Sequence, residues 1–421
     1  GVFSSWPDGS DTEDRAHGGK ANPVEVTFTA EGEVLGTVAV YDGINGRHDA
    51  VLHWMHGAKY NLNPGRGADL PQTSYPLLPP VSRRGWVAPP GLTRYRSGAF
   101  GAEYKDDIFM CEFNTHRVYR IQLERDGASF SSTDQVFLES SSPYTHFTDV
   151  FEDADGSLLV VDTGGWFLYG CPTSSIEKPE VRGAIYRIRK KGASPPRDPR
   201  GVALQWQNAQ DERIAEKLND PRFMVRDKAI QHLANSGKSA LPSLRKVLAS
   251  SSDIQARRNA VWALTRIHTE EARTIVRGAL NDASESVRLT AARSISTHRD
   301  KHTLAALRKL VIADAAPIRR EAAAALGRIG DKRAVPSLLT SLESAADDRF
   351  LQHALIYALI EIGDPGPLRL GLKSSIPAVQ QGALIALDQM PNAKLASNEL
   401  SPALKSDNSM LRDHAIRIAT A

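Results

Sequence analysis

A nine-residue pattern recurs seven times in the C-terminal half of the chain, and its spacing restricts the fold more than any other feature. Each copy has apolar residues at positions i, i+4, i+5 and i+8, which share one face of a helix. The copies begin 31, 31, 31, 33, 28 and 32 residues apart, at Val225, Ala256, Val287, Ile318, Leu351, Val379 and Leu411. Second amphipathic segments such as ALPSLRKVLAS lie between them. Because so short a two-helix unit cannot bury its apolar face alone, residues 210–421 are predicted to form an α-solenoid of about fourteen stacked helices.

Polar residues of the repeats also recur at fixed places. An acidic residue precedes each of five cores and is predicted to cap its helix, namely Asp220, Asp253, Asp282, Asp314 and Asp348, with Pro221 in a first turn. One arginine per repeat follows, at Arg226, Arg257, Arg288 and Arg319. We expect these guanidiniums to bridge to acidic turn residues of adjacent repeats, although such a line could also bind an acidic partner. The histidines of this half show no i, i+4 metal pairing and are interpreted as solvated or locally bonded, at positions His232, His268, His298, His302, His353 and His414.

The repeat motif resembles short HEAT repeats of the phycobilin-lyase-like kind. This resemblance implies a fold only, since such repeats serve many binding roles. The last copy runs into Ala421 without a polar capping helix, and we therefore expect the natural stack to continue.

The N-terminal half has a different pattern, with short alternating or β-branched runs between Gly, Asp, Asn and Pro turns. The segment PVEVTFTAEGEVLGTVAV from Pro23 matches HFTDVFEDADGSLLVVDTGG from His146, and both contain an acidic-Gly hairpin turn. A third copy runs from GLTRYR at Gly91 to DIFMCEF, and two copies end on VYRI and IYRI, predicted as outer strands. Copies about 60 residues apart with three or four strands each are typical of propeller blades.

The fold class is therefore all-β followed by all-α: a partial β-propeller of about three blades, then an α-solenoid of short HEAT-like repeats. The predicted boundaries are 1–195 for the propeller part, 196–209 for a Pro- and Arg-rich linker and 210–421 for the solenoid. Three blades cannot close a ring, so we expect further blades before this stretch. The first residues, GVFSSWPDGS, lack a signal-peptide profile, which also suggests an internal fragment.

Composition excludes several classes of function. The net charge of +3 is small for 421 residues and the basic residues are scattered, so nucleic-acid binding is not indicated. No apolar run approaches the length of a membrane helix. The two cysteines, Cys111 and Cys171, cannot form a cysteine zinc cluster or a c-type haem attachment, and we expect both to be buried free thiols.

Several blocks carry a second resemblance: VAPPGLTRYRSGAF, DIFMCEFNTHRVYRI, HFTDVFEDADGSLLVVDTGGWF and GCPTSSIEKPEVRGAIYRI. They resemble the membrane-bound dehydrogenase-like proteins of planctomycetes and verrucomicrobia, whose propeller is similar to that of quinoprotein glucose and sorbosone dehydrogenases. The resemblance covers about residues 20–190. It implies a periplasmic or extracellular oxidoreductase acting on a sugar or alcohol, with pyrroloquinoline quinone and calcium as cofactors. A c-type cytochrome domain or a protein partner bound through the repeats is also implied.

The resemblance places a candidate cofactor site on five residues: Trp86, Asn114, His146, Asp162 and Trp166. His146 and Thr148 stand where the quinoprotein pattern has Arg-x-Arg, and Asn114 stands where it has a lysine. Three cationic contacts to the acidic quinone are thus replaced, which weakens the expectation of quinone binding. The alternative for His146 is a histidine that hydrogen-bonds adjacent loops.

Each remaining candidate also has a structural alternative. Trp86 could stack on a flat cofactor or sugar, or pack in a core. Asp162 and Trp166 flank a Gly-Gly pair that suits a ligand site or a tight blade corner. The acidic group of Asp149, Glu152, Asp153 and Asp155 could hold calcium, but a plain hairpin turn explains Asp153 to Gly156 without metal.

Two classes of function therefore remain. The first is an extracytoplasmic sugar or alcohol dehydrogenase with the repeats as a spacer or docking domain. The second is a non-catalytic binding or scaffold protein, in which the propeller holds a carbohydrate or protein ligand.

Overall fold

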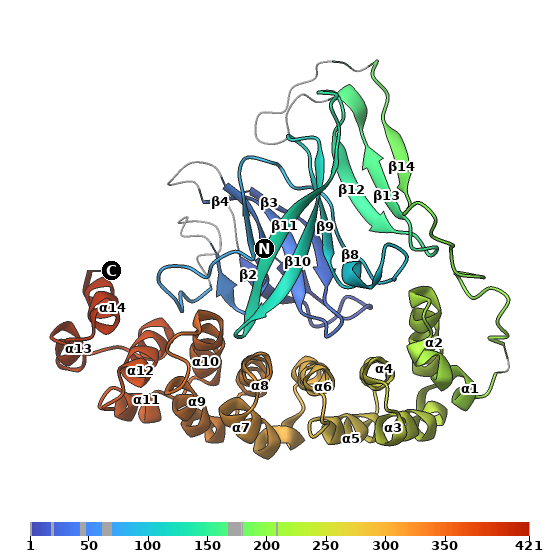
Figure 1. The fold of residues 1–421 in the computed structure, drawn as a ribbon. Helices are drawn as coiled ribbons and strands as arrows, with labels where there is room; N and C mark the ends of the chain where they lie inside the picture. Colours follow the sequence, from blue (N-terminus) through green and yellow to red (C-terminus); the bar gives the residue numbers. More distant parts are fainter. Residues whose placement is uncertain are drawn as a thin grey trace.

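The computed structural model describes residues 2–17, 21–42, 48–60, 70–166, 178, 180–207 and 209–420. All strands belong to the N-terminal half, called the β region below, and all α-helices follow it. The last described strand ends at Ile188 and the first α-helix begins at Asp211. The helices form an arc, and the sheets lie on its inner side (Figure 1).

The β region consists of small, open sheets. Three are antiparallel and coincide with the three predicted copies: β3-β4-β5-β7, β8 to β11, and β12-β13-β14. A further small sheet, β1-β2-β6, contains a parallel pair. The strands are β1 (Val2–Ser4), β2 (Glu13–His17), β3 (Ala21–Phe28), β4 (Val34–Asp42), β5 (His48–His53), β6 (Ala58–Lys59), β7 (Ser82–Arg84), β8 (Leu92–Arg94), β9 (Ile108–Glu112), β10 (Arg117–Asp126), β11 (Ser129–Glu139), β12 (Phe147–Glu152), β13 (Leu158–Asp162) and β14 (Ala184–Ile188).

The two acidic-Gly hairpins close in the same way, as their sequence similarity predicts. Gly32 donates its N–H to Thr29 at 3.0 Å, and Gly156 donates to Asp153 at 2.8 Å. Both glycines have a positive φ, 84° and 80°, which other residues adopt only with strain. The carboxylates of the second turn bind arginines, since Asp153 lies 2.7 Å from an Arg187 nitrogen. The hairpin interpretation of this acidic group therefore has direct support.

The predicted order of strands is wrong in one sheet. The strand containing VYRI is β10, which lies between β9 and β11, so β11 forms the outer edge. The strand containing IYRI is β14, which does lie at an edge. The copies from Gly91 and His146 therefore differ by one strand in the described residues, because β10 continues into a hairpin with β11 that the copy from His146 lacks.

The solenoid has fourteen α-helices in the described residues, and the seven cores occupy the even-numbered ones, which confirms the register. In Figure 1, α4, α6, α8 and α10 lie nearest the sheets and the odd-numbered helices lie outside them. The helices are α1 (Asp211–Ala215), α2 (Phe223–Ser236), α3 (Leu241–Ser250), α4 (Ile254–Thr265), α5 (Glu270–Ala279), α6 (Glu285–His298), α7 (Leu304–Ala313), α8 (Ala316–Ile329), α9 (Val335–Leu342), α10 (Arg349–Ile362), α11 (Pro365–Gly371), α12 (Pro377–Gln389), α13 (Ser397–Leu404) and α14 (Ser409–Thr420).

The predicted caps are correct in part. Asp253 and Asp348 accept N–H groups of the first turns of α4 and α10. The other three aspartates bind N–H groups in the turn before the helix, and Pro221 also precedes α2 rather than opening it. The capping prediction is therefore wrong for these three, because each helix begins one or two residues later than a capping aspartate would require.

The repeated arginines fasten the turns. Arg257 binds Asp282 at 2.8 and 3.0 Å, and Arg288 binds Asp314 at 2.8 and 2.7 Å, which confirms the bridges for these two. The predicted bridge to an acidic residue is wrong for Arg226 and Arg319. Both donate hydrogen bonds to backbone carbonyls, and Arg319 also donates to a serine hydroxyl. A shared contact explains why arginine recurs at this position of the repeat. In four repeats the arginine donates to the carbonyl six residues earlier, at Arg226, Arg257, Arg288 and Arg412.

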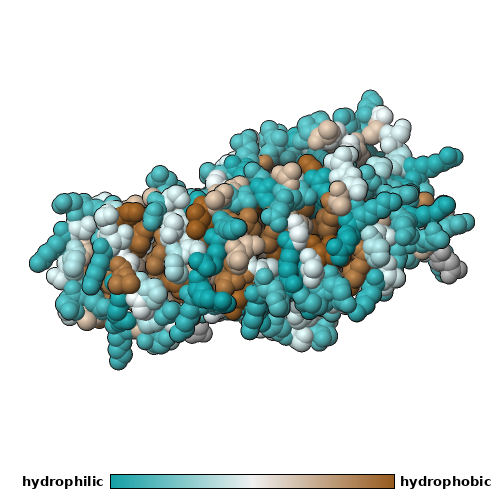
Figure 2. Space-filling view, turned by 90° about the horizontal axis from the view of Figure 1, so that it is seen from below, coloured by the Kyte–Doolittle hydropathy of each residue, from teal (hydrophilic) through white to brown (hydrophobic). Residues whose placement is uncertain are grey.

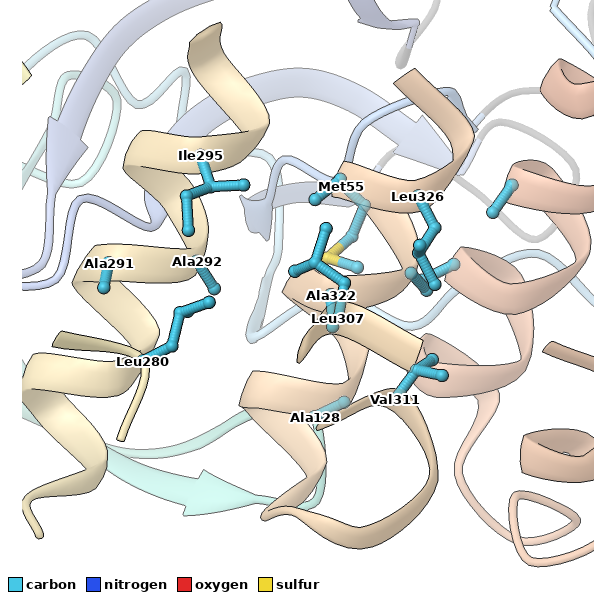
Figure 3. Close-up of a cluster of buried hydrophobic side chains, with 14 of the residues drawn as sticks. Met55, Ala128, Leu280, Ala291, Ala292, Ile295, Leu307, Val311, Ala322 and Leu326 are labelled. Carbon is cyan, nitrogen blue, oxygen red and sulfur yellow. The ribbon is translucent and has the colours of Figure 1, made fainter. Parts of the chain in front are cut away.

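One apolar core crosses from the β region into the solenoid. Met55 and Ala128 of the β region lie among Leu280, Ile295 and Leu326 of the helices (Figure 3). The opposite side of the arc is mixed, with apolar patches between polar side chains (Figure 2). No helix in the described part of the chain is long and apolar enough to span a membrane. Cys111 is a buried free thiol, and Cys171 lies outside the described residues.

Candidate functional site

The two ends of the sheets have different surroundings. The end that holds Asp49, Trp86, Asn114, His146 and Asp162 is called the outer end, and the end that touches the helices is called the solenoid-facing end. Strand β8 shows the orientation, because Arg96 just beyond it binds Asp227 of α2 at 2.8 and 2.6 Å. The loop immediately before β8, which contains Trp86, therefore lies at the opposite end of that strand, away from α2.

Trp86 lies in a loop between β7 and β8 that is fixed by backbone hydrogen bonds. The buried Asp49 carboxylate accepts the N–H groups of Val87 and Ala88 at 3.0 and 2.7 Å. Asn114 donates its backbone N–H to Val87 at 3.0 Å and its side-chain amide to the Trp86 carbonyl at 3.5 Å. Trp86 is 45% exposed, so this residue lies at the surface on a loop that hydrogen bonds fix.

His146 lies beneath this loop and is fully buried. Its ring stacks on Phe113, with centroids 4.4 Å apart, and its Nδ1 lies 2.7 Å from the Gly164 carbonyl. Since a carbonyl only accepts, Nδ1 carries the proton and donates it to Gly164. The backbone N–H of His146 donates to Asp162 at 2.8 Å, and the same carboxylate oxygen accepts the Gly164 N–H at 2.8 Å. The side chains of His146 and Asp162 thus both bind the backbone of Gly164 and stabilise the turn after β13.

The structure therefore brings together four of the five predicted site residues. A chain of contacts runs from Trp86 through Asn114 and its neighbour Phe113 to His146 and Asp162. The backbone of Trp166 lies in the short 3-10 helix η2 (Gly164–Trp166), but its side chain lies outside the described residues.

These side chains do not fit an acidic quinone. The imidazole that stands in place of an arginine has Nδ1 bonded to Gly164, and the Thr148 hydroxyl donates to Val161 at 3.4 Å. The Asn114 amide is neutral, and the nearby carboxylates of Asp49 and Asp162 would repel a polyanion. Within the described residues, no group of three or more His, Cys, Asp or Glu could hold a metal ion.

The solenoid-facing end contains a buried ionic cluster that sequence analysis missed. Glu33, the residue before β4, is fully buried between Arg320 of α8 at 2.8 Å and Arg125 of β10 at 2.9 and 2.7 Å. Burial alone would raise the pKa of Glu33, but the two guanidiniums hold it well below its usual range. His53 lies 3.9 Å from Glu33, and burial together with the Arg320 charge lowers its pKa.

A cavity of about 260 Å³ lies beside this cluster, between β1, β3 and β5 and helices α6, α8 and α10. Its basic side chains are already paired with carboxylates, either within one half of the chain or across the two halves. Arg328 binds Glu13 at 2.7 and 2.8 Å, and Arg15 lies 3.1 Å from the same carboxylate. Burial and the neighbouring Arg328 charge lower the pKa of Arg15 to about 10. Glu13 therefore links the β region to the solenoid through Arg328.

The prediction for His353 is wrong. This residue of α10 is fully buried, and it binds the β region rather than solvent or its own repeat. Its Nε2 lies 2.9 Å from the His56 carbonyl and its Nδ1 lies 2.6 Å from the Thr73 hydroxyl. Because the carbonyl only accepts, Nε2 donates to it and Nδ1 accepts from Thr73, which is the pattern of a neutral ring.

The hairpin tip of β3 and β4 shows how closely the halves approach. Trp262 of α4 donates its indole N–H to Ala30 at 3.1 Å, and Arg258 of the same helix lies 3.2 Å from Glu31. A Cβ at Gly32 would lie 2.8 Å from the Trp262 ring, so no larger residue fits. The only sequence signal for this contact is an arginine and a tryptophan four residues apart on the face that the repeat pattern leaves unassigned.

Comparison with known proteins supports the solenoid. A family profile for HEAT repeats matches residues 212–286 and 277–360. The C-terminal half therefore contains HEAT repeats. No curated protein sequence matches the chain.

Three solved structures illustrate the range of similarity. A glucose dehydrogenase-type oxidoreductase from Thermus thermophilus is 19% identical with a TM-score of 0.26, over 35% of this chain and 40% of that one. A phycocyanin lyase complex from Nostoc is 20% identical with a TM-score of 0.31, over 50% of this chain and 93% of that one. An archaeal HEAT-like repeat protein from Thermococcus onnurineus is 13% identical with a TM-score of 0.31, over 43% and 79%. At these TM-scores the similarity establishes no function, and this chain spans less than half of the oxidoreductase.

Proposed function

We propose that the chain is a non-catalytic carbohydrate-binding protein that uses the outer end of the β region, while the HEAT solenoid holds that region in place. The observation that carries the proposal is the Trp86 platform: a tryptophan residue with 45% exposure on a loop anchored by Asp49 and Asn114. A flat apolar ring at the protein surface suits the C–H face of a sugar. The adjacent amide of Asn114 can exchange hydrogen bonds with hydroxyl groups.

Rigidity of the platform supports this function. Hydrogen bonds hold the loop at Val87, Ala88 and the Trp86 carbonyl before any ligand arrives. A loop already fixed in its binding conformation loses little entropy on binding. The stacked pair of Phe113 and His146 supports it from below.

The proposal includes a propeller arrangement of the three antiparallel sheets, each serving as one blade. The equivalent closure of the hairpins at Gly32 and Gly156 supports this arrangement, because repeated blades repeat their turns. An extracytoplasmic location, as implied by the family resemblance, is part of the same proposal.

Quinone-dependent oxidation of a sugar or alcohol is the competing function. The burial of His146 and its bond to Gly164 argue against it, because the imidazole cannot replace an arginine at a carboxylate without leaving Gly164 unpaired. Addition of pyrroloquinoline quinone and calcium to the purified chain should therefore produce no binding heat in calorimetry. Saturable binding that disappears in His146→Ala would favour the dehydrogenase instead.

Affinity electrophoresis through gels that contain a panel of soluble polysaccharides tests the carbohydrate proposal. At least one polysaccharide should retard the chain, and Trp86→Ala should lose the retardation. Phe151→Ala is the matched control, because Phe151 is an aromatic residue with 41% exposure on β12. Retardation by no member of the panel, or equal retardation of Trp86→Ala, would remove the proposal.

A further inference from the structure

A second cavity, of about 350 Å³, lies at the solenoid-facing end on the other side of the β3–β4 hairpin tip. The residues after β8, the loop before β9 and helices α2 and α4 enclose it. Its charged lining consists of six basic and two acidic side chains: Arg94, Arg96, Lys105, Arg226, Arg258, Arg266, Asp106 and Asp227. We propose that this cavity binds the phosphate groups of a small molecule. The proposal is independent of carbohydrate binding at the outer end.

The positive charge in the cavity is only partly compensated. Arg96 uses both terminal nitrogens on Asp227, and Arg258 reaches Glu31 at 3.2 Å and Ser286 at 3.0 Å. Among the described residues, Arg226 donates hydrogen bonds to the backbone carbonyls of Asp220 and Pro221, which carry no net charge. The cavity therefore has an excess of cationic groups that an anion would neutralise.

Arg94 is the least satisfied of these groups. Its side chain is 14% exposed, and its nearest carboxylate is Asp106, 3.6 Å from Nε and itself 51% exposed. Neither Nε nor Nη1 of Arg94 has a hydrogen-bond partner among the described residues, and the Nε atoms of Arg96 and Arg258 share this state. Buried donors without partners are costly, so three guanidiniums with such atoms around one cavity indicate a place for an acceptor-rich ligand.

The electrostatics of the cluster agree with this geometry. Burial lowers the pKa of Arg94 to about 10; the Asp106 charge opposes this effect, and the charges of Arg96 and Arg258 add to it. Burial and the charge of Arg96 also lower the pKa of Arg226. An anion between these side chains would replace mutual repulsion by attraction.

The shape and donor chemistry favour phosphate. Guanidinium groups present paired N–H donors that match phosphate oxygens, and here they converge from a strand end and two helices. A water molecule in liquid occupies about 30 Å³, so the cavity has room for more than one phosphate group. A cavity of this size accommodates a small molecule better than an extended acidic peptide.

Isothermal titration calorimetry of the purified chain with inorganic pyrophosphate tests the proposal. We expect binding at one site that weakens with added NaCl, together with a higher Tm in the presence of pyrophosphate. Arg94→Gln should weaken the affinity at least tenfold. Arg245→Gln is the matched control, because Arg245 is an exposed arginine on α3 outside the cavity. This variant should bind pyrophosphate as tightly as the natural chain.

A second variant keeps the test decisive if Arg94→Gln does not fold. Lys105 is an exposed residue at the cavity rim, and Lys105→Gln should weaken pyrophosphate binding roughly threefold without lowering the Tm. Glycerol 2-phosphate distinguishes the source: tighter binding than pyrophosphate indicates an organic phosphate ester, and weaker binding indicates an inorganic or diphosphate ligand. The proposal would be overturned if the natural chain does not bind pyrophosphate, or if both cavity variants bind it as tightly as the natural chain does. Binding of a polyglutamate peptide in place of pyrophosphate would also overturn it.

Discussion

The two ends of the β region are held by different kinds of contact. At the outer end, Asp49, Asn114 and His146 hydrogen-bond to loops of the same half of the chain. At the solenoid-facing end, Glu33 and His53 lie against Arg320 from the helices, and ion pairs cross between the halves. The outer end can therefore serve a ligand, while the opposite end is committed to the assembly of the chain.

This difference also separates what each end contributes to stability. Charges buried in pairs cost much when one partner is removed, because the other remains unpaired in a dry environment. An exposed aromatic ring on a loop contributes little to folding. Substitutions at the two ends should therefore differ in size, and the following four experiments measure that difference.

The largest effect is expected where the halves share their core. Leu326 of α8 is fully buried beside Met55 (Figure 3), so Leu326→Asp places an unpaired charge between the β region and the solenoid. We expect a loss of about 4 kcal/mol or more in the free energy of unfolding by chemical denaturation. Ile312→Asp on α7, where the residue is 40% exposed, should have little effect. Equal stability of the two variants would contradict the shared core.

The ionic cluster should give the next largest effect. Arg320→Ala leaves Glu33 buried with Arg125 alone, and we expect a loss of about 3–5 kcal/mol in the free energy of unfolding. Arg333→Ala, on a 74% exposed arginine of the same solenoid, should leave denaturation almost unchanged. The double variant Glu33→Gln with Arg320→Met should lose less than Arg320→Ala, because no unpaired carboxylate remains. A double variant that is less stable than Arg320→Ala would show that the pair stabilises through its charges.

The sequence predicted these two ends unequally. The seven helical cores and the three sheets follow from local periodicity, and the HEAT profile match supports the first. The position of the outer end was also predictable, because Trp86, Asn114 and His146 lie close in sequence to strand ends that similar hairpins define. The chemistry of the outer end was less predictable, because the burial of His146 depends on Phe113 and the Gly164 carbonyl, and no sequence pattern indicates these contacts.

The solenoid-facing end was not predictable from local pattern. Glu33 follows a hairpin turn as any solvated acid could, and Arg320 is one of two adjacent arginines in its repeat. Their meeting depends on how the arc of helices curves around the sheets, a property of the whole stack (Figure 1). The interpretation of His353 as solvated or locally bonded fails for the same reason, since its partners Thr73 and His56 belong to the other half.

The pH dependence of stability should report the buried His353. Burial lowers its pKa from 6.5 to about 4, so between these values the unfolded chain binds a proton that the folded chain does not. The contribution of His353 to stability therefore falls as pH falls through this window, by about 2 to 3 kcal/mol between pH 7.5 and 4.5. His353→Gln can keep both hydrogen bonds without titrating, and its denaturation midpoint should depend less on pH. An unchanged slope in that variant would place the titration elsewhere.

The smallest effect is expected at the outer end. Trp86→Ala removes a ring from a residue that is 45% exposed, and the anchoring bonds from Asp49 to Val87 and Ala88 do not involve the indole. We expect a loss of about 1 kcal/mol or less, similar to Phe151→Ala, in the same denaturation assay that reports Arg320→Ala. A loss as large as that of Arg320→Ala would mean that the indole packs as core. The outer end would then be structural, and the contrast between the two ends of the β region would fail together with the carbohydrate platform.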